Sequence, residues 1–285
     1  MKKPMRILSK SSSKQSEERP PLRGRKAKDM KKSRTYVFYG PSGTGKTTLA
    51  ATFPKPIAFG DFRDEGTDSI MEVPGIQVFP IENWEDVETF YDQIKGKLLT
   101  DDDGKPFYPK TVVIDTATNM QQMAIEHVVA QKKKNKSNKS AGDWGSMTKQ
   151  EWGEVASLMK QWMALYAALP VDTIFIAQQR IFNADEDGGA DSELAPEVGA
   201  RLSPSVKDAL NAAADVIGST FIMRKQKVKE VKGKKIRSER SVYCLRVGPN
   251  PVYITKIRKP KAIEAPSTIE DPEYDDIIAV IKGEA

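Results

Sequence analysis

The chain of 285 residues is poor in the side chains that bind transition metals or form disulfides. It has one cysteine, Cys244, and one histidine, His127. It can therefore close no internal disulfide, and these two side chains alone do not complete a zinc site. The sequence also lacks any run of eighteen apolar residues, and its first residues are polar, which predicts neither a membrane span nor a secretory signal. We expect a cytoplasmic protein without thiol or zinc chemistry.

What the chain does have is enough apolar residues for a core and an uneven charge. Hydrophobic residues make up 39% of it. Residues 1–34 carry thirteen Lys and Arg against three Asp and Glu, so this segment has a net charge of +10 and the remainder −4, out of +6 overall. The segment is also rich in Ser and Pro, which predicts a disordered basic arm. Such an arm attracts nucleic-acid phosphates, or it only improves solubility.

Segments typical of strands and helices alternate between residues 35 and 180, and from Asp215 onward the runs resemble antiparallel strands. This order predicts an α/β fold with a largely parallel central sheet covered by helices and an antiparallel C-terminal extension. Thr148 and Glu151 have the spacing of a capping box, and Asp271 is the expected cap of a last short helix. The predicted divisions are the arm (1–34), a core (35–262) and a C-terminal linker with a short helix (263–285).

A glycine-rich motif follows the first predicted strand and opens the next helix. The residues Gly40-Pro41-Ser42-Gly43-Thr44-Gly45-Lys46-Thr47 fit the pattern G-x-x-x-x-G-K-[ST]. In such a loop, backbone N–H groups converge on phosphate oxygens, the lysine reaches the outer phosphates, and the last hydroxyl binds Mg²⁺. The sequence predicts that residues Gly40 to Thr48 bind ATP with Mg²⁺. The alternative, an ordinary glycine turn, fits the context poorly.

Acidic residues follow two of the predicted strands. Asp115 comes directly after the apolar run Thr111–Ile114, where a second carboxylate on the magnesium side is expected; the alternative is a helix N-cap. Glu65, and after it Asp64, follow the second strand and are candidates for activating the water that attacks ATP. The alternative for both is that they are solvated loop charges.

Three further polar residues are candidates for contacts to the nucleotide. Gln178 ends a later buried strand and can hydrogen-bond the terminal phosphate, unless the backbone satisfies it locally. Lys256 and Arg258 take alternate positions on an extended segment and so point to one side. Two such cations can neutralise phosphate charge, including that of a neighbouring subunit's nucleotide, whereas the alternative is a solvated edge strand.

Five stretches together resemble the RecA-type recombination ATPases, and most closely the small phage proteins that keep only the RecA core and act in single-strand annealing. The stretches are Tyr39–Thr48, Ala58–Asp61, Val112–Thr116, Ile174–Arg180 and Tyr253–Arg258. They span roughly residues 35 to 260. The resemblance implies a RecA-like P-loop NTPase fold and ATPase activity for the core.

The resemblance also implies roles for individual residues. It places the water-activating acid at Glu65 or Asp64, the sensor of the terminal phosphate at Gln178, and the cations acting across a subunit interface at Lys256 and Arg258. In this family two loops contact DNA, and here these are 132–146 and 181–202. The first contains Trp144 as a stacking surface and five lysines, Lys132, Lys133, Lys134, Lys136 and Lys139.

The leading functional hypothesis is a DNA-dependent ATPase on single-stranded DNA in recombination or annealing. It would assemble head-to-tail as a ring or filament, with a single-strand-binding protein as a further partner, in the host cytoplasm if it is encoded by a phage. The alternative is an ATP-switched loader or adaptor, which the acidic stretch 185–199 would suit. A small-molecule kinase is disfavoured because residues 181–200 contain no Arg or Lys for a lid.

Overall fold

The computed structural model of the chain describes residues 33–63, 66–134, 147–182, 196–231 and 234–284. These residues belong to one compact unit, Ser33–Ala285. The strands are β1 (Thr35–Gly40), β2 (Ile57–Asp61), β3 (Ile76–Pro80), β4 (Thr111–Asp115), β5 (Asp172–Phe182), β6 (Glu197–Ala200), β7 (Val216–Val231), β8 (Lys234–Arg246), β9 (Lys256–Ile257) and β10 (Thr268–Glu270). The helices are α1 (Lys46–Ala50), the 3₁₀ helix η2 (Gly66–Ile70), α2 (Trp84–Gly96), α3 (Ala117–Lys134), α4 (Lys149–Ala167), α5 (Pro204–Ala213) and α6 (Tyr274–Lys282).

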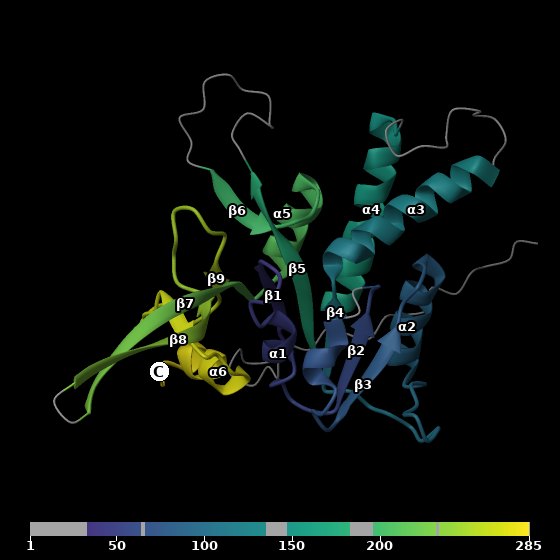
Figure 1. Ribbon diagram of the computed structural model, residues 1–285. Helices are drawn as coiled ribbons and strands as arrows, with labels where there is room; N and C mark the ends of the chain where they lie inside the picture. The colour runs from purple at the N-terminus through teal and green to yellow at the C-terminus, as the bar shows by residue number, and fades with distance from the viewer. Residues whose placement is uncertain (1–32, 64–65, 135–146, 183–195, 232–233, 285) are drawn as a thin grey trace, which may run out of the picture. The chain divides into compact units, whose positions relative to one another are not determined.

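The central sheet has the strand order β10-β8-β7-β1-β5-β4-β2-β3 (Figure 1). Neighbouring strands from β7 through β1, β5, β4 and β2 to β3 are parallel, and β8 and β10 pair antiparallel at the other end. The predicted fold class, an α/β fold with a largely parallel sheet and an antiparallel C-terminal extension, is confirmed. Because β5 lies between β1 and β4, the carboxyl ends of all three strands lie side by side at one edge of the sheet.

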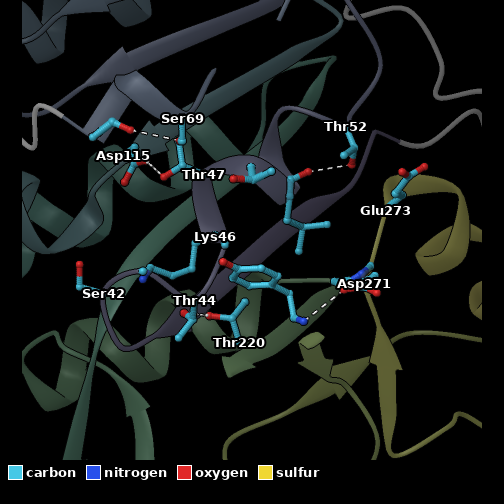
Figure 2. A pocket seen from close by; sticks show the side chains of 17 residues that line it. Ser42, Thr44, Lys46, Thr47, Thr52, Ser69, Asp115, Thr220, Asp271 and Glu273 are labelled. Carbon is cyan, nitrogen blue, oxygen red and sulfur yellow. Dashed lines mark hydrogen bonds between the residues drawn. The ribbon is translucent and has the colours of Figure 1, made fainter. Parts of the chain in front are cut away.

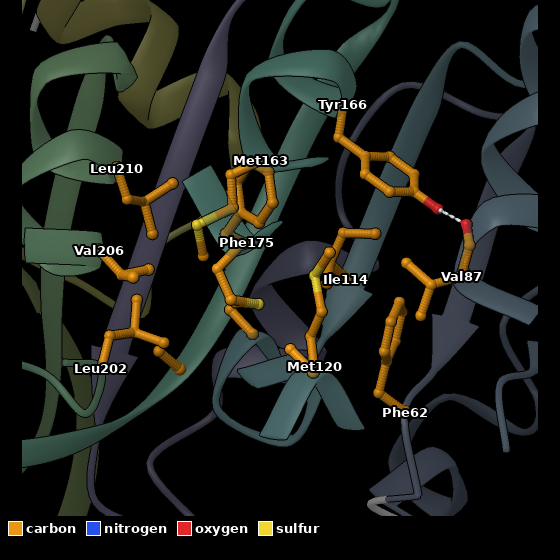
Figure 3. Packing of buried hydrophobic residues seen from close by; sticks show 14 of the residues in the cluster. Phe62, Val87, Ile114, Met120, Met163, Tyr166, Phe175, Leu202, Val206 and Leu210 are labelled. Atoms are coloured by element: carbon orange, nitrogen blue, oxygen red, sulfur yellow. Dashed lines mark hydrogen bonds between the residues drawn. The ribbon is translucent and has the colours of Figure 1, made fainter. Parts of the chain in front are cut away.

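Helices cover both faces of this sheet. Successive side chains of a strand point to opposite faces, and in β1 Val37 and Tyr39 join one buried cluster with α2, α3, α4 and α5. Tyr36 and Phe38 join a second cluster, which includes residues of α1 and α6. Figure 3 shows part of the first cluster, with Phe175 of β5 among side chains from several helices. The sheet is therefore a rigid base for the loops at its carboxyl edge.

Helix ends follow the capping signals only in part. At the start of α4, the Thr148 side chain accepts from the Glu151 backbone and the Glu151 side chain accepts from the Thr148 backbone, so the predicted capping box is confirmed. The prediction that Asp271 caps α6 is wrong, because the N-cap is Glu273, whose backbone N–H donates to Asp276. Asp271 instead has a positive φ of 42°, a conformation that lies outside the extended range of an N-cap.

Two elements extend beyond their predicted ends. α3 continues to Lys134, so the first lysines of the predicted DNA loop lie in a helix; Lys and Gln favour helices. β5 continues past Gln178 to Phe182 because it pairs antiparallel with β6, from Gln179 opposite Ala200 to Phe182 opposite Glu197. The expected loop at 185–199 is therefore wrong at its last residues, which form β6.

The segment 263–285, predicted as a linker with a short helix, packs on the core. β10 pairs with β8, and Ile277 and Ile281 of α6 are buried in the cluster that contains Leu49 and Phe53. The backbone N–H of Tyr274 also donates to Thr52 Oγ1 at 2.9 Å. The C-terminal segment is thus held against the end of α1.

Candidate nucleotide-binding site

The glycine-rich loop lies between β1 and α1, at the carboxyl edge of the sheet. Gly43 and Gly45 have φ values of 74° and 83°, a region that other residues adopt only with strain. At Gly40 a side chain is excluded by packing, because a Cβ atom would lie 2.3 Å from the Thr220 hydroxyl oxygen on β7. The backbone therefore forms a tight loop that ends at the N-terminus of α1, where N–H groups are available to an anion.

Lys46 and Thr44 fix the shape of this loop. The ammonium group of Lys46 is buried and donates to the carbonyl oxygens of Gly40 at 3.1 Å and Pro41 at 2.7 Å. The Thr44 hydroxyl donates to the Pro41 carbonyl at 2.8 Å and lies 2.6 Å from the Thr220 hydroxyl. The positive charge of Lys46 is thus held inside the loop, where it can pair with phosphate oxygens.

Thr47 and Asp115 come together beside the loop, as the sequence predicts. The Thr47 hydroxyl donates to Asp115 Oδ2 at 2.8 Å. Asp115 is buried at the end of β4, and its Cα is in register with that of Asp61 at the end of β2. A hydroxyl and a carboxylate are the oxygen ligands that Mg²⁺ prefers. This donor set fits the magnesium ion of a nucleotide, and Thr47 and Asp115 are the residues that would hold it.

These residues line a cavity of about 580 Å³ (Figure 2), a volume within the range of small-molecule sites. The loop from Ser42 to Thr48 forms one part of it. Apart from Asp115, the other lining residues were not predicted, and all of them except Leu49 and Thr52 come from distant segments. These further lining residues are Leu49, Thr52, Gly66, Ser69, Thr220, Tyr243, Asp271, Pro272 and Glu273. No local motif marks them, because only the folded sheet brings the C-terminal segment to α1.

The two predicted water-activating acids, Asp64 and Glu65, lie outside the described residues. Gly66 and Ser69, which follow them, line the cavity. Arg63, which directly precedes the two acids in the sequence, forms an ion pair with Glu126 at 2.8 Å. The described chain therefore reaches the cavity directly after the two acids, and their catalytic role stays a prediction.

Gln178 lies next to the loop in the sheet but lines a different hollow. Its Cα is in register with that of Gly40 across β1 and β5. Its side-chain oxygen accepts from Arg201 at 3.0 Å, and its backbone N–H donates to the Thr118 hydroxyl. These groups line a second hollow of about 430 Å³, with Trp152 among the other lining residues. Gln178 is thus close to the loop through the backbone, while its side chain is engaged elsewhere.

Lys256 and Arg258 lie near the amino-terminal ends of β1 and β7. The Lys256 ammonium donates to the Asn211 carbonyl at 2.7 Å, at the end of α5. Arg258 donates to Asp215 Oδ1 at 3.0 Å, and Asp215 Oδ2 in turn accepts from the Thr35 N–H. Because the glycine-rich loop follows the opposite end of β1, these cations are away from the nucleotide cavity of their own chain.

The lysines predicted to bind DNA are only partly described. Lys132 lies in α3 and forms an ion pair with Glu154 of α4 at 3.0 Å. Lys133 also lies in α3 and is exposed, and Lys134 is the last residue of that helix. Lys136 and Lys139, like most of the predicted loop 132–146, lie outside the described residues. DNA binding by this segment stays a prediction.

The sheet order, the glycine-rich loop and the Thr47–Asp115 pair define a P-loop nucleotide-binding domain. The family model described as an AAA domain matches residues 32–258, and the chain belongs to this family. No curated protein sequence gives a significant match. Over the described parts of the chain, the helices are too short or too polar to cross a membrane.

Solved structures also match this chain, and two of them match over most of its length. The flagellar accessory protein FlaH from Methanocaldococcus jannaschii is 10% identical, over 83% of this chain and 84% of that one, with a TM-score of 0.34. The RadB recombinase is 14% identical, over 74% of this chain and 80% of that one, with a TM-score of 0.36.

Proposed function

We propose that the protein is a Mg²⁺- and DNA-dependent ATPase that acts on single-stranded DNA in phage recombination or annealing. One observation supports its ATPase part above all: the Thr47 hydroxyl and the Asp115 carboxylate meet at 2.8 Å in the cavity that holds Lys46. A hydroxyl, a carboxylate and a buried ammonium beside a helix N-terminus form the arrangement that triphosphate chemistry requires. In the host cell the protein would act in the cytoplasm.

Each residue of the site has a proposed role in hydrolysis. The N–H groups of the loop bind the phosphate oxygens, and Lys46 pairs with the negative charge of the outer phosphates. Thr47 and Asp115 hold the metal, which when bound neutralises phosphate charge. Glu65 or Asp64 takes the proton of the attacking water. Gln178 would sense the terminal phosphate and relay its loss, a role that requires its side chain to leave Arg201.

We further propose that chains assemble head-to-tail, as a ring or filament, with nucleotide at the subunit interfaces. Lys256 and Arg258 lie away from their own P-loop, so they would serve the nucleotide of a neighbouring subunit. The lysines at 132–139 and the basic arm 1–34 would contact the DNA backbone, and a single-strand-binding protein would be a further partner.

A second candidate function is an ATP-switched loader or adaptor for a replication or recombination partner. The contacts of Lys256 and Arg258 favour it, because both side chains already bind groups of their own chain. In that case hydrolysis would release the partner and DNA would have little effect on its rate.

The rate of ATP hydrolysis with and without single-stranded DNA distinguishes the two candidates. The ATPase proposal predicts that DNA raises the rate of hydrolysis. It also predicts that the affinity for DNA falls steeply as the salt concentration rises, since the protein would contact many DNA phosphates. If a chain that lacks residues 1–33 shows the same dependence of DNA affinity on salt, the phosphate contacts belong to the core. If ATP binds but DNA does not change the rate of hydrolysis, the adaptor function is favoured.

A further inference from the structure

The nucleotide cavity continues past the phosphate-binding loop along α1. Thr48 of α1 and Thr52, in the turn just after this helix, both line it. In Figure 2, Asp115 and Asp271 lie on opposite sides of Lys46. The Asp115 side holds the groups suited to the metal and the outer phosphates. A bound nucleotide would therefore direct its other end toward Asp271.

The Asp271 side of the cavity is unsuited to phosphate. Lys46 is the only cationic side chain among the described residues that line the cavity, whereas Asp271 and Glu273 carry carboxylates. Carboxylates repel phosphate but accept hydrogen bonds from hydroxyl and amino groups. Tyr243 adds an aromatic ring, which is 45% exposed. A Cβ on Gly45 would lie 3.2 Å from this ring, so Tyr243 borders the phosphate-binding loop directly.

This part of the cavity wall is held in place by several contacts. Asp271 and Tyr243 exchange backbone and side-chain hydrogen bonds, with the Asp271 N–H donating to the Tyr243 carbonyl at 2.6 Å and the Tyr243 N–H donating to Asp271 Oδ1 at 3.2 Å. Asp271 Oδ2 accepts from Arg240 at 2.6 Å. The rings of Phe53 and Tyr274 pack at 4.9 Å and join α6 to the end of α1. The wall is thus preformed rather than shaped by a ligand.

We infer that Tyr243 and the turn Asp271–Glu273 form the nucleoside-binding wall of the site. The base stacks on the Tyr243 ring, and the carboxylates of the turn face the hydrogen-bond donors of the nucleoside, its ribose hydroxyls or exocyclic amino group. Each carboxylate oxygen has two lone pairs, so Asp271, which already accepts from Arg240 and Tyr243, and Glu273 both have acceptor capacity for the ligand. This inference rests on the proposed function and assigns the C-terminal segment to recognition of its substrate.

Calorimetric titration with Mg-ATP and with inorganic tripolyphosphate, which lacks a nucleoside, tests the inference. Replacing Tyr243→Ala should weaken ATP binding about tenfold or more, as expected for loss of stacking, and should leave tripolyphosphate binding unchanged. Tyr243→Leu keeps apolar packing against Gly45 and should show the same loss, while Tyr243→Phe keeps the ring and most of the affinity. Tyr108→Ala, an exposed tyrosine that does not line the cavity, is the control.

Two results would overturn the inference while the proposed function stands. One is unchanged ATP affinity in both Tyr243→Ala and Tyr243→Leu. The other is an equal loss for ATP and tripolyphosphate, which would mean that Tyr243 only supports the loop. If the unaltered chain binds neither ligand, the proposed function fails and the inference with it. If it binds ATP without hydrolysing it, the ATPase proposal fails and the wall is still tested.

Discussion

At the residue scale, the proposed magnesium site at Thr47 and Asp115 predicts how activity depends on metal. In the proposed site, Thr47→Ala removes one oxygen ligand of the magnesium ion and Asp115→Asn removes the negative charge of the other, so hydrolysis of Mg-ATP should fall by about 10²-fold. Binding of ATP in the presence of a chelator should change little, since the loop and Lys46 stay intact. Titrations with and without Mg²⁺ measure both quantities, and Thr89→Ala on α2 is a control. Full activity in Asp115→Asn would exclude it as a ligand.

The sequence was sufficient to predict the loop residues, Thr47 and Asp115, because each lies in a short motif next to a strand. The remaining lining residues were missed for a physical reason. Thr220 meets Thr44 across 176 positions of the chain, and Tyr243 reaches Gly45 only because β7 and β8 extend the sheet beside β1. Contacts of this kind depend on strand order, which the local pattern does not encode.

At the element scale, packing against β7 explains why β1 ends in glycine. An added Cβ at Gly40 would lie 2.3 Å from Thr220 Oγ1 and 2.5 Å from the Thr220 carbonyl oxygen, so Gly40→Ala should destabilise the fold by about 1–3 kcal/mol. Gly153, in the second turn of α4, has open space around it, and Gly153→Ala should stabilise the fold by about 0.5–1 kcal/mol. Denaturant unfolding measures the change in the free energy of unfolding for both variants. Equal changes in Gly40→Ala and Gly153→Ala would contradict the packing argument.

The capping box of α4 predicts a pH dependence. Hydrogen bonds from the Thr148 backbone and side chain lower the pKa of Glu151 below its ordinary value of 4.5. Because this pKa is lower in the folded chain, the Glu151 carboxylate stabilises the fold above pH 4.5, and the stabilisation is lost as the pH falls through the folded value.

Glu151→Gln keeps a capping side chain but does not titrate. The melting temperature of the unaltered chain should therefore fall more than that of Glu151→Gln between about pH 6 and about pH 3. Parallel curves for the two proteins would show that the carboxylate contributes nothing to this dependence.

Strands and helices with regular local patterns were predicted closely, and the misses occur where distant pairing decides the structure. The run Thr111–Ile114 is apolar throughout, and it forms β4 in the middle of the sheet. Ile181 and Phe182 belong to the predicted loop 181–202, yet they continue β5 because β6 supplies hydrogen-bond partners. In the same way the residues of β10 were predicted as a linker, although they pair with β8, whereas the predicted short helix at the end of the chain is α6.

At the scale of the whole molecule, the proposed head-to-tail assembly predicts that two inactive variants restore each other. Lys46→Ala chains keep Lys256 and Arg258, and Arg258→Ala chains keep the P-loop. In an equal mixture, about a quarter of the interfaces should combine an intact P-loop with intact cations. ATPase activity should therefore return on mixing. Melting curves of each variant are needed as controls, because Arg258 also pairs with the buried Asp215.

Failure of the mixture to regain activity, with both variants folded, would mean that each chain uses only its own residues. The contacts of Lys256 and Arg258 within the chain would then be their whole role. That result would contradict shared sites but would leave the nucleotide cavity itself unaffected.

The central claim is that the chain hydrolyses Mg-ATP at the loop around Lys46, and phosphate release by the intact protein tests it most directly. Lys46→Ala should reduce the rate by about 10²-fold or more, since the buried ammonium no longer pairs with the phosphates. Lys105→Ala, which removes a solvent-exposed lysine paired with Asp103, should leave the rate unchanged. Equal rates in the unaltered chain and Lys46→Ala, or no hydrolysis by the unaltered chain with and without DNA, would contradict the claim.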